Sequence, residues 1–167
     1  VHATSAIGII KRLITVSGEG DGNLAKDLIC DANIVSSLMA QRLVKKICPH
    51  CSHSLESHLP TLESKLVGRL IETLGEDLSG VRLKNENGCS RCHRGNIGRT
   101  VVAEIINTDQ KFMALITRSN FEAETYWLEA LNGMPMMAHG LLKVKRGLID
   151  PYDLEDELEF IQLPKAF

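Results

Sequence analysis

Two pairs of cysteines, Cys48 with Cys51 and Cys89 with Cys92, are the residues of this chain best suited to chemistry. Each pair has C-x2-C spacing, which places two thiols on one side of a tight turn. Two such pairs can close one tetrahedral site of four sulfur ligands, the arrangement typical of structural zinc. Four protein ligands leave no open position for water or substrate. We therefore predict a metal that stabilises the fold and takes no part in hydrolysis.

Other interpretations of these cysteines remain open. Iron also accepts tetrahedral thiolate ligands, so the sequence does not separate iron from zinc, and two redox-active pairs or buried free thiols are further alternatives. Nearby histidines could each replace a cysteine as ligand, but with four thiols available we interpret them as solvated loop residues: His50, His53, His58 and His93. Cys30 lies in an apolar stretch and is interpreted as a small buried hydrophobic residue.

Composition narrows the class of protein. The chain has 167 residues, of which 44% are hydrophobic and 24% charged, as expected for one ordinary soluble domain or two small ones. Its net charge of -2 argues against a zinc ribbon that binds nucleic acid, because neutralising phosphates requires a basic surface. We find no apolar run long enough to span a membrane and no signal peptide, and reduced C-x2-C pairs suit the cytoplasm.

The first half of the chain alternates expected helices and strands. Apolar residues repeat with helical spacing from Ala6 to Ile14, a helix that Thr4 or Ser5 can cap and Gly18 can end. The glycine-rich stretch 18–22 lacks the Lys-Ser/Thr ending of a phosphate loop, so we interpret it as a turn, with a short helix after it from Asn23. The chain has no initiating methionine and opens directly in this pattern, so we expect it to begin within a domain.

Residues 34–47 are ambiguous, because their β-branched residues favour a buried strand although 36–43 could be helical. The segment between the cysteine pairs should contain a helix over 62–74, capped by Thr61 and ended by Gly75. After the second pair, 100–106 is predicted to be a strand covered on both faces. Glu104 interrupts that run and needs a partner, for which Arg99 is the nearest candidate.

The remainder should be helical, over 109–117, 120–131, 135–146 and 151–160, with Asp150 capping the last helix. The fold class is therefore mixed α/β and rich in helix. Expected core residues are Phe121, Trp127, Met137, Leu141 and Val144. The acidic side chains near the end are expected to form a solvated helix face: Asp153, Glu155, Asp156, Glu157 and Glu159.

Taken in order, several of these motifs resemble one family. They are Val1-His2-Ala3-Thr4-Ser5-Ala6, then Ala40-Gln41-Arg42-Leu43-Val44-Lys45-Lys46-Ile47-Cys48, then Gly88-Cys89-Ser90-Arg91-Cys92, then Gly95, and finally Gly98-Arg99 and Glu104-Ile105-Ile106. This order is similar to the C-terminal half of the type II secretion and type IV pilus assembly ATPases, and the resemblance covers essentially the whole chain. The segment between the cysteine pairs is longer than is common there, and Asn96-Ile97 replaces the usual residues before Gly98.

The resemblance implies a fold and its division. Members of this family are hexameric motors with a RecA-like core, into which the tetracysteine element is inserted ahead of a helical C-terminal subdomain. Residues 1–47 would then be the C-terminal part of the nucleotide-binding core, and 48–98 the metal-binding subdomain with Cys48, Cys51, Cys89 and Cys92 as ligands. Residues 99–167 would be a core strand followed by the helical subdomain.

The resemblance also implies a function. His2 matches the last histidine of the family's histidine box, and Arg99 matches a Gly-Arg motif, so both are candidate catalytic residues of the assembled motor. The full-length protein would bind ATP and Mg²⁺ and power pilus assembly or protein secretion. It would form a hexamer in the cytoplasm, docked on the cytoplasmic domain of an inner-membrane platform protein.

This sequence itself contains neither Gly-x4-Gly-Lys-Ser/Thr nor an upstream acidic strand for Mg²⁺, so we expect no ATP hydrolysis by the chain alone. The alternatives are a free-standing zinc-ribbon binding module and an adaptor that docks a partner in the secretion machine.

Overall fold

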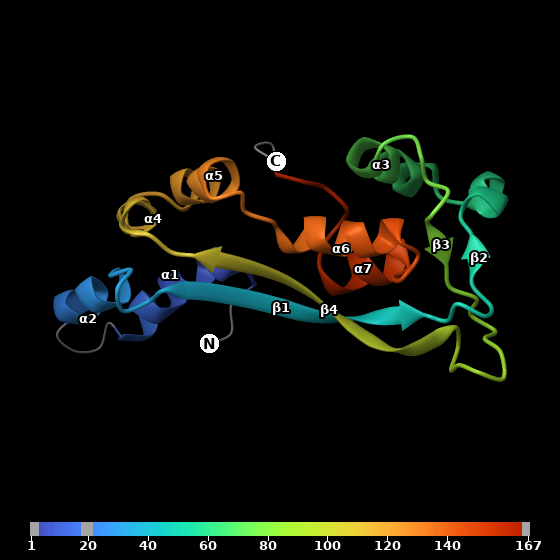
Figure 1. The fold of residues 1–167 in the computed structure, drawn as a ribbon, viewed down its shortest axis with the longest axis horizontal. Helices are drawn as coiled ribbons and strands as arrows, with labels where there is room; N and C mark the ends of the chain where they lie inside the picture. Colours follow the sequence, from blue (N-terminus) through green and yellow to red (C-terminus); the bar gives the residue numbers. More distant parts are fainter. Residues whose placement is uncertain (1–3, 18–21, 165–167) are drawn as a thin grey trace. The chain divides into compact units, whose positions relative to one another are not determined.

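The computed structural model describes residues 4–17 and 22–164, which form two compact units. Unit 1 takes in the chain up to Gln41 together with Ala103–Met136, and unit 2 takes in Arg42–Val102 and Met137–Leu163. The described residues form seven α-helices, one 3₁₀-helix and two small two-stranded sheets (Figure 1). This composition confirms the predicted mixed α/β, helix-rich class.

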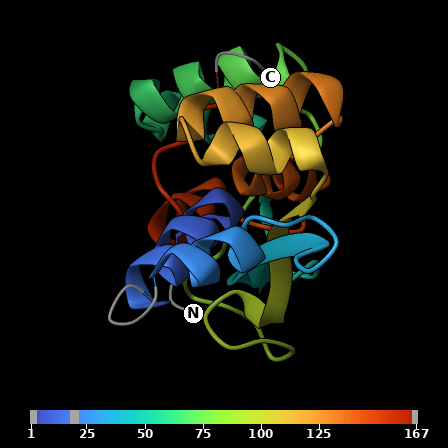
Figure 2. The same ribbon diagram turned by 90° about the vertical axis from the view of Figure 1, so that its left-hand side faces the viewer.

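Unit 1 contains two pairs of packed helices. Helix α1 (Ala6–Ser17) packs on α2 (Gly22–Ile29), and α4 (Gln110–Ile116) packs on α5 (Asn120–Ala130), as Figure 2 shows. The Ser5 hydroxyl accepts the backbone N–H of Gly8 at 3.2 Å, which confirms the predicted cap of α1. The predicted turn at 18–22 lies almost wholly outside the described residues.

The longest strands, β1 (Ser37–Ile47) and β4 (Asn96–Asn107), pair with each other (Figure 1). The strand predicted over 34–47 is therefore confirmed in its main part, and the helical alternative over 36–43 is wrong. The expectation that 100–106 is covered on both faces is also wrong for the described chain. Successive side chains of a strand point to opposite faces, and here Val102 and Ile106 are fully buried while Val101 and Ile105 are 37% and 53% exposed.

Glu104 of β4 is buried, and its partners differ from the one predicted. Its carboxylate accepts the backbone N–H of Ala6 at 2.5 Å and that of Met136 at 3.2 Å. These two residues begin α1 and α6 (Met136–Lys145). Arg99 is exposed and forms no ion pair with Glu104. The physical reason is that the first N–H groups of a helix have no partner inside it and carry partial positive charge, so they can satisfy a carboxylate as a cation would.

Unit 2 builds the segment between the cysteine pairs from short elements. Strands β2 (His53–Ser54) and β3 (Arg82–Leu83) pair in antiparallel register, with His53 opposite Leu83. A 3₁₀-helix η1 (Glu56–Thr61) precedes α3 (Ser64–Leu74), which buries Leu66 and Leu70. Helix α3 ends at Gly75 as predicted, where φ is 84°, but Glu63 and not Thr61 occupies its N-cap position.

The last two helices, α6 and α7 (Pro151–Glu157), lie in contact. A Cβ at Gly140 of α6 would come within 2.5 Å of the Leu154 side chain, so a larger residue there would have to displace this buried leucine. The Asp150 carboxylate accepts the backbone N–H of Tyr152 at 2.8 Å, which confirms the predicted cap of α7. Helix α7 ends three residues short of the predicted Phe160.

Most predicted core residues are buried, namely Trp127, Met137, Leu141 and Val144. Phe121 is the exception, since 76% of it is exposed. It lies in the first turn of α5, where helical spacing directs it away from buried Ala123 and Trp127. The assignment of Phe121 to the core is therefore wrong.

The acidic side chains of α7 are not one solvated face. Asp153 is only 3% exposed and accepts a hydrogen bond from the Lys84 ammonium at 3.0 Å. Glu155 accepts two hydrogen bonds from the Arg69 guanidinium, at 2.8 and 2.9 Å. The prediction is therefore wrong for these two residues, because basic side chains distant in the sequence fold against them within unit 2.

Candidate metal centre

The four predicted cysteine ligands lie on two tight turns next to the long strands. Cys48 and Cys51 follow the end of β1, where the Cys48 carbonyl accepts the N–H of Ser52 at 3.1 Å. Cys89 and Cys92 precede β4, where the Cys89 carbonyl accepts the N–H of Cys92 at 3.2 Å. Each turn therefore presents both of its side chains to the same side, as the C-x2-C spacing predicted.

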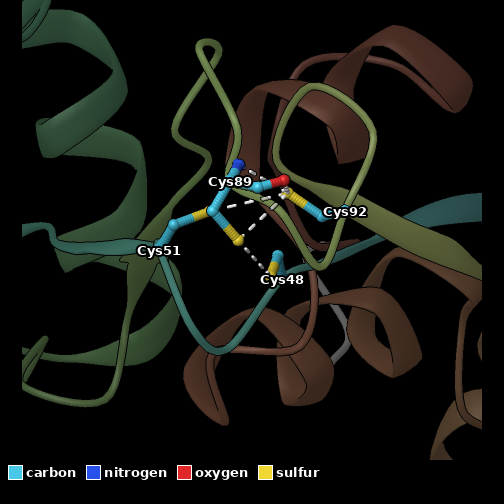
Figure 3. Close-up of side chains that lie close together, drawn as sticks. All are labelled: Cys48, Cys51, Cys89 and Cys92. Atoms are coloured by element: carbon cyan, nitrogen blue, oxygen red, sulfur yellow. Dashed lines mark hydrogen bonds between the residues drawn. The ribbon is translucent and has the colours of Figure 1, made fainter.

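The four sulfurs form a compact cluster, with all of them within 4.8 Å of one another. Figure 3 shows their side chains converging from the two turns. The measured Sγ–Sγ distances are 3.9 Å for Cys48 with Cys89, 3.7 Å for Cys51 with Cys92, and 3.7 Å for Cys89 with Cys92. A tetrahedron of sulfurs about 2.3 Å from a zinc ion has edges of about 3.8 Å, whereas a disulfide brings sulfurs to about 2.05 Å. The cysteines are free, and they are positioned to bind a metal ion.

The charges of this cluster also favour a cation. Burial raises the pKa of the Cys51 thiol to about 12, and hydrogen bonds with the other thiols add to the effect. Burial acts in the same direction on Cys92, but hydrogen bonds from the N–H groups of Cys89 and Gly95 and from thiols lower its pKa to about 7. Ionisation of Cys92 is thus favoured and that of Cys51 opposed. A bound metal would supply the positive charge that lets all four ligate as thiolates.

Gly95 holds the two turns together, whereas in the sequence it stood out only as part of the family resemblance and had no predicted role at the site. Its carbonyl accepts the N–H of Cys48 at 2.7 Å, joining the second turn to the first. Its φ is 76°, and a Cβ there would lie 2.4 Å from the Asn85 carbonyl oxygen, so no other residue fits. The signal available in the sequence was a glycine three residues after the last cysteine, where a turn must close.

The histidines near the cluster stay outside it. Among the described residues, the group able to hold a metal contains only the four cysteines. His50 and His93 are exposed, and the rings of His53 and His58 pack against each other 5.0 Å apart. Cys30 is half-buried and separate from the cluster, and burial raises the pKa of its thiol.

Of the two candidate catalytic residues, His2 and Arg99, the described part of the chain contains only Arg99. His2 lies outside the described residues. Arg99 is exposed on β4. The structure therefore brings together the four cysteines and does not bring Arg99 to them.

Comparison with known proteins identifies the family to which this fold and cysteine cluster belong. Residues 1–158 match the family model described as "Type II/IV secretion system protein". The chain belongs to this family. The predicted resemblance is thereby confirmed, and it extends beyond the cysteine cluster to both units.

Individual relatives agree with the assignment. The chain is 28% identical over 149 residues to a type II secretion system protein E of Pseudomonas aeruginosa, and 27% identical over 150 residues to the type IV pilus assembly ATPase PilB of the same organism. A PilB of Thermus thermophilus is 26% identical over 150 residues. Each match covers 89% of this chain but only 26%, 24% and 15% of the respective relative. The chain therefore spans about a quarter or less of the length of these relatives.

Among the described residues, none of the helices is both long and apolar enough to cross a membrane.

Proposed function

We propose that this chain acts as the C-terminal part of a cytoplasmic hexameric ATPase that powers type IV pilus assembly or type II protein secretion. The observation that carries the proposal is the family match over residues 1–158. It is supported by relatives named as secretion and pilus ATPases and by the sulfur cluster between the paired strands β1 and β4. In this proposal the strand pair belongs to the edge of a RecA-like core.

The metal in this proposal is structural zinc held by Cys48, Cys51, Cys89 and Cys92. The sulfur spacing fits a tetrahedral ion, and four protein ligands would leave no position for a reacting water. The site joins the residues that follow β1 to the residues that precede β4. Its role would be to fix the ends of these strands.

ATP and Mg²⁺ would bind to parts of the full-length protein that this sequence does not contain, because it has no Gly-x4-Gly-Lys-Ser/Thr motif. His2 and Arg99 would contribute to ATP turnover only in the assembled hexamer. An exposed guanidinium such as that of Arg99 can reach a phosphate group on a neighbouring subunit, as arginine residues do in other NTPases. The hexamer would work at the inner membrane, docked on the cytoplasmic domain of a platform protein.

Replacement of Arg99 tests this proposal. Because Arg99 is exposed, Arg99→Ala should leave the melting temperature of the zinc-loaded chain unchanged. In the full-length protein the same change should lower the ATPase rate at least about tenfold, since arginines that stabilise phosphoryl transfer contribute large factors.

The matched control is Arg118→Ala, another exposed arginine, which should affect neither measurement. The chain alone should hydrolyse no ATP in a coupled assay. A normal ATPase rate in full-length Arg99→Ala would refute the assigned role of Arg99. ATP turnover by the chain alone would refute the proposed division of labour.

A further inference from the structure

Unit 2 contains a surface pocket of about 470 Å³, and of its lining residues the proposed function uses only Arg99. It lies where β1, the turn after β3 and the start of β4 meet, and its lining residues are Lys45, Lys84, Glu86, His93, Arg94, Asn96, Gly98 and Arg99. Four of these side chains carry a permanent positive charge. Such a concentration is unexpected in a chain whose net charge is -2.

The acidic groups at this pocket do not balance its cations. The Asp153 carboxylate is 3.0 Å from the Lys84 ammonium and 3.6 Å from that of Lys45, so one carboxylate serves two lysines. The other acidic group, Glu86, lies 3.6 Å from Lys84 with 84% of its side chain exposed, which makes it a weak partner in water. Arg94 and Arg99 add two further charges, so the pocket as a whole favours an anion.

Lys84 is held in place before any ligand arrives. Its backbone N–H donates to the Asp150 carboxylate at 2.6 Å, and its ammonium donates to Asp153. Burial lowers the pKa of Lys84, but Asp153, Asp150 and Glu86 outweigh that effect and raise the pKa above its usual value. The lysine therefore stays charged.

The backbone of Arg94 is fixed by the turn that contains it. It occupies a left-handed backbone conformation, with φ of 48°, at the tip of a turn closed by two hydrogen bonds between His93 and Asn96, at 3.1 and 3.0 Å. The Asn96 side-chain amide donates to the Arg94 carbonyl at 3.1 Å. The turn fixes the backbone position from which the exposed Arg94 side chain extends, and its guanidinium can donate two parallel hydrogen bonds to a phosphate.

The lining also shows which part of a ligand it can recognise. Apart from Gly98 its lining residues are charged or polar, and the single ring among them is the imidazole of His93, so charge and not stacking would select the ligand. We propose that this pocket binds the phosphate groups of a small diphosphate-type ligand through Lys45, Lys84, Arg94 and Arg99.

Pyrophosphate should bind more tightly than sulfate, because it carries more negative charge and more acceptor oxygens for the four cations of the pocket.

Titration calorimetry on the zinc-loaded chain with inorganic pyrophosphate tests the proposal. We expect saturable binding at one site per chain, and at least about tenfold weaker binding in the double variant Arg94→Asn, Arg99→Gln, since charge-assisted hydrogen bonds are lost. Asparagine is chosen at position 94 because it tolerates positive φ. The control Arg118→Gln removes one exposed arginine outside the pocket and should leave the affinity unchanged.

Three further titrations show which chemical group of a ligand the pocket recognises. ADP should bind about as tightly as pyrophosphate, adenosine should not compete, and sulfate should bind more weakly. Competition by adenosine would overturn the assignment of phosphate groups as the recognised part. An affinity for sulfate equal to that for pyrophosphate, absence of pyrophosphate binding, or equal weakening in Arg118→Gln would overturn the site. Because none of these outcomes involves ATP turnover, they are distinguishable from a failure of the proposed function.

Discussion

The sulfur cluster of unit 2 and the buried carboxylate of unit 1 both join segments that lie far apart in the sequence, but their charges are balanced differently. The four thiols connect the turns at 48–51 and 89–92, and they repel one another when ionised. Glu104 connects the starts of α1 and α6, and two backbone N–H groups already satisfy it. One junction is thus positioned to take up an ion from solution, whereas the other is complete within the chain.

This difference means that the two units should respond to different perturbations. The order of the cysteine turns should follow metal supply, because the free energy of metal binding becomes free energy of folding. The junction at Glu104 should be insensitive to chelators, since its partners are backbone donors. The following predictions test this contrast.

Removal of the metal should have the largest effect. Structural zinc contributes of order 10 kcal/mol in apparent binding free energy, which is comparable with the whole stability of a small domain. Chelation or Cys89→Ser should therefore abolish protection from hydrogen exchange around 48–95, while the amides of α4 and α5 keep theirs.

Cys30→Ser is the matched control, because Cys30 lies outside the cluster, and it should leave the exchange pattern unchanged. Elemental analysis should find about one zinc per chain in the unchelated protein. Absence of both zinc and iron, or unchanged exchange in Cys89→Ser, would contradict the metal assignment.

Replacement of Glu104 should have the next largest effect, and it should be the same with and without chelator. Glu104→Ala leaves two N–H groups without their acceptor and should lower the free energy of unfolding by about 3 kcal/mol. Glu104→Gln keeps one oxygen acceptor and should lose less. Glu129→Ala removes an exposed glutamate as control, and denaturant unfolding gives all three values. Equal stability of the Glu104 and Glu129 variants would show that the carboxylate does not hold unit 1 together.

Two glycine-to-alanine variants, one in each unit, compare how closely atoms pack around the two positions. In unit 1, a Cβ at Gly133 would lie 2.4 Å from the Trp127 ring, so Gly133→Ala should cost about 1–3 kcal/mol. In unit 2, a methyl group added at Gly68 on α3 would have no neighbouring atom within 4 Å, so Gly68→Ala should stabilise by about 0.5–1 kcal/mol. Thermal unfolding measures both, and a melting temperature lowered by Gly68→Ala would contradict the geometry described for α3.

The smallest effect concerns the pH dependence of the α4 cap. The N–H of Phe112 lowers the pKa of Asp109, and the Tyr126 hydroxyl acts in the same direction. A folded pKa below the unfolded one means that the cap contributes fully above the unfolded pKa and less as pH falls through the folded pKa. Asp109→Asn can still cap α4 but does not titrate, so it should remove this part of the acid sensitivity. An NMR titration of Asp109 showing a raised pKa would contradict this prediction.

The sequence by itself determined the elements whose signal is local. The C-x2-C spacing predicted which four thiols would converge, because a tight turn needs only neighbouring residues to form. The helices that begin at Asp109 and Asp150 were likewise predictable, since a capping side chain bonds to N–H groups two or three residues further on. The family resemblance could also be recognised from the sequence, because its motifs are short runs of neighbouring residues.

Only the tertiary structure decided which distant groups meet. The sequence suggested Arg99 as the partner of Glu104, but the partners are the backbone N–H groups of Ala6 and Met136. Every residue except proline carries such a donor, so the spacing of residues in the sequence cannot identify the two that bind. The acidic run in α7 appeared solvated until folding placed Lys84 beside Asp153, 69 residues away in the chain. The same folding gathers Lys45, Lys84, Arg94 and Arg99 into one pocket, because the charge of a residue is local but its neighbours in space are set by the packing of whole elements.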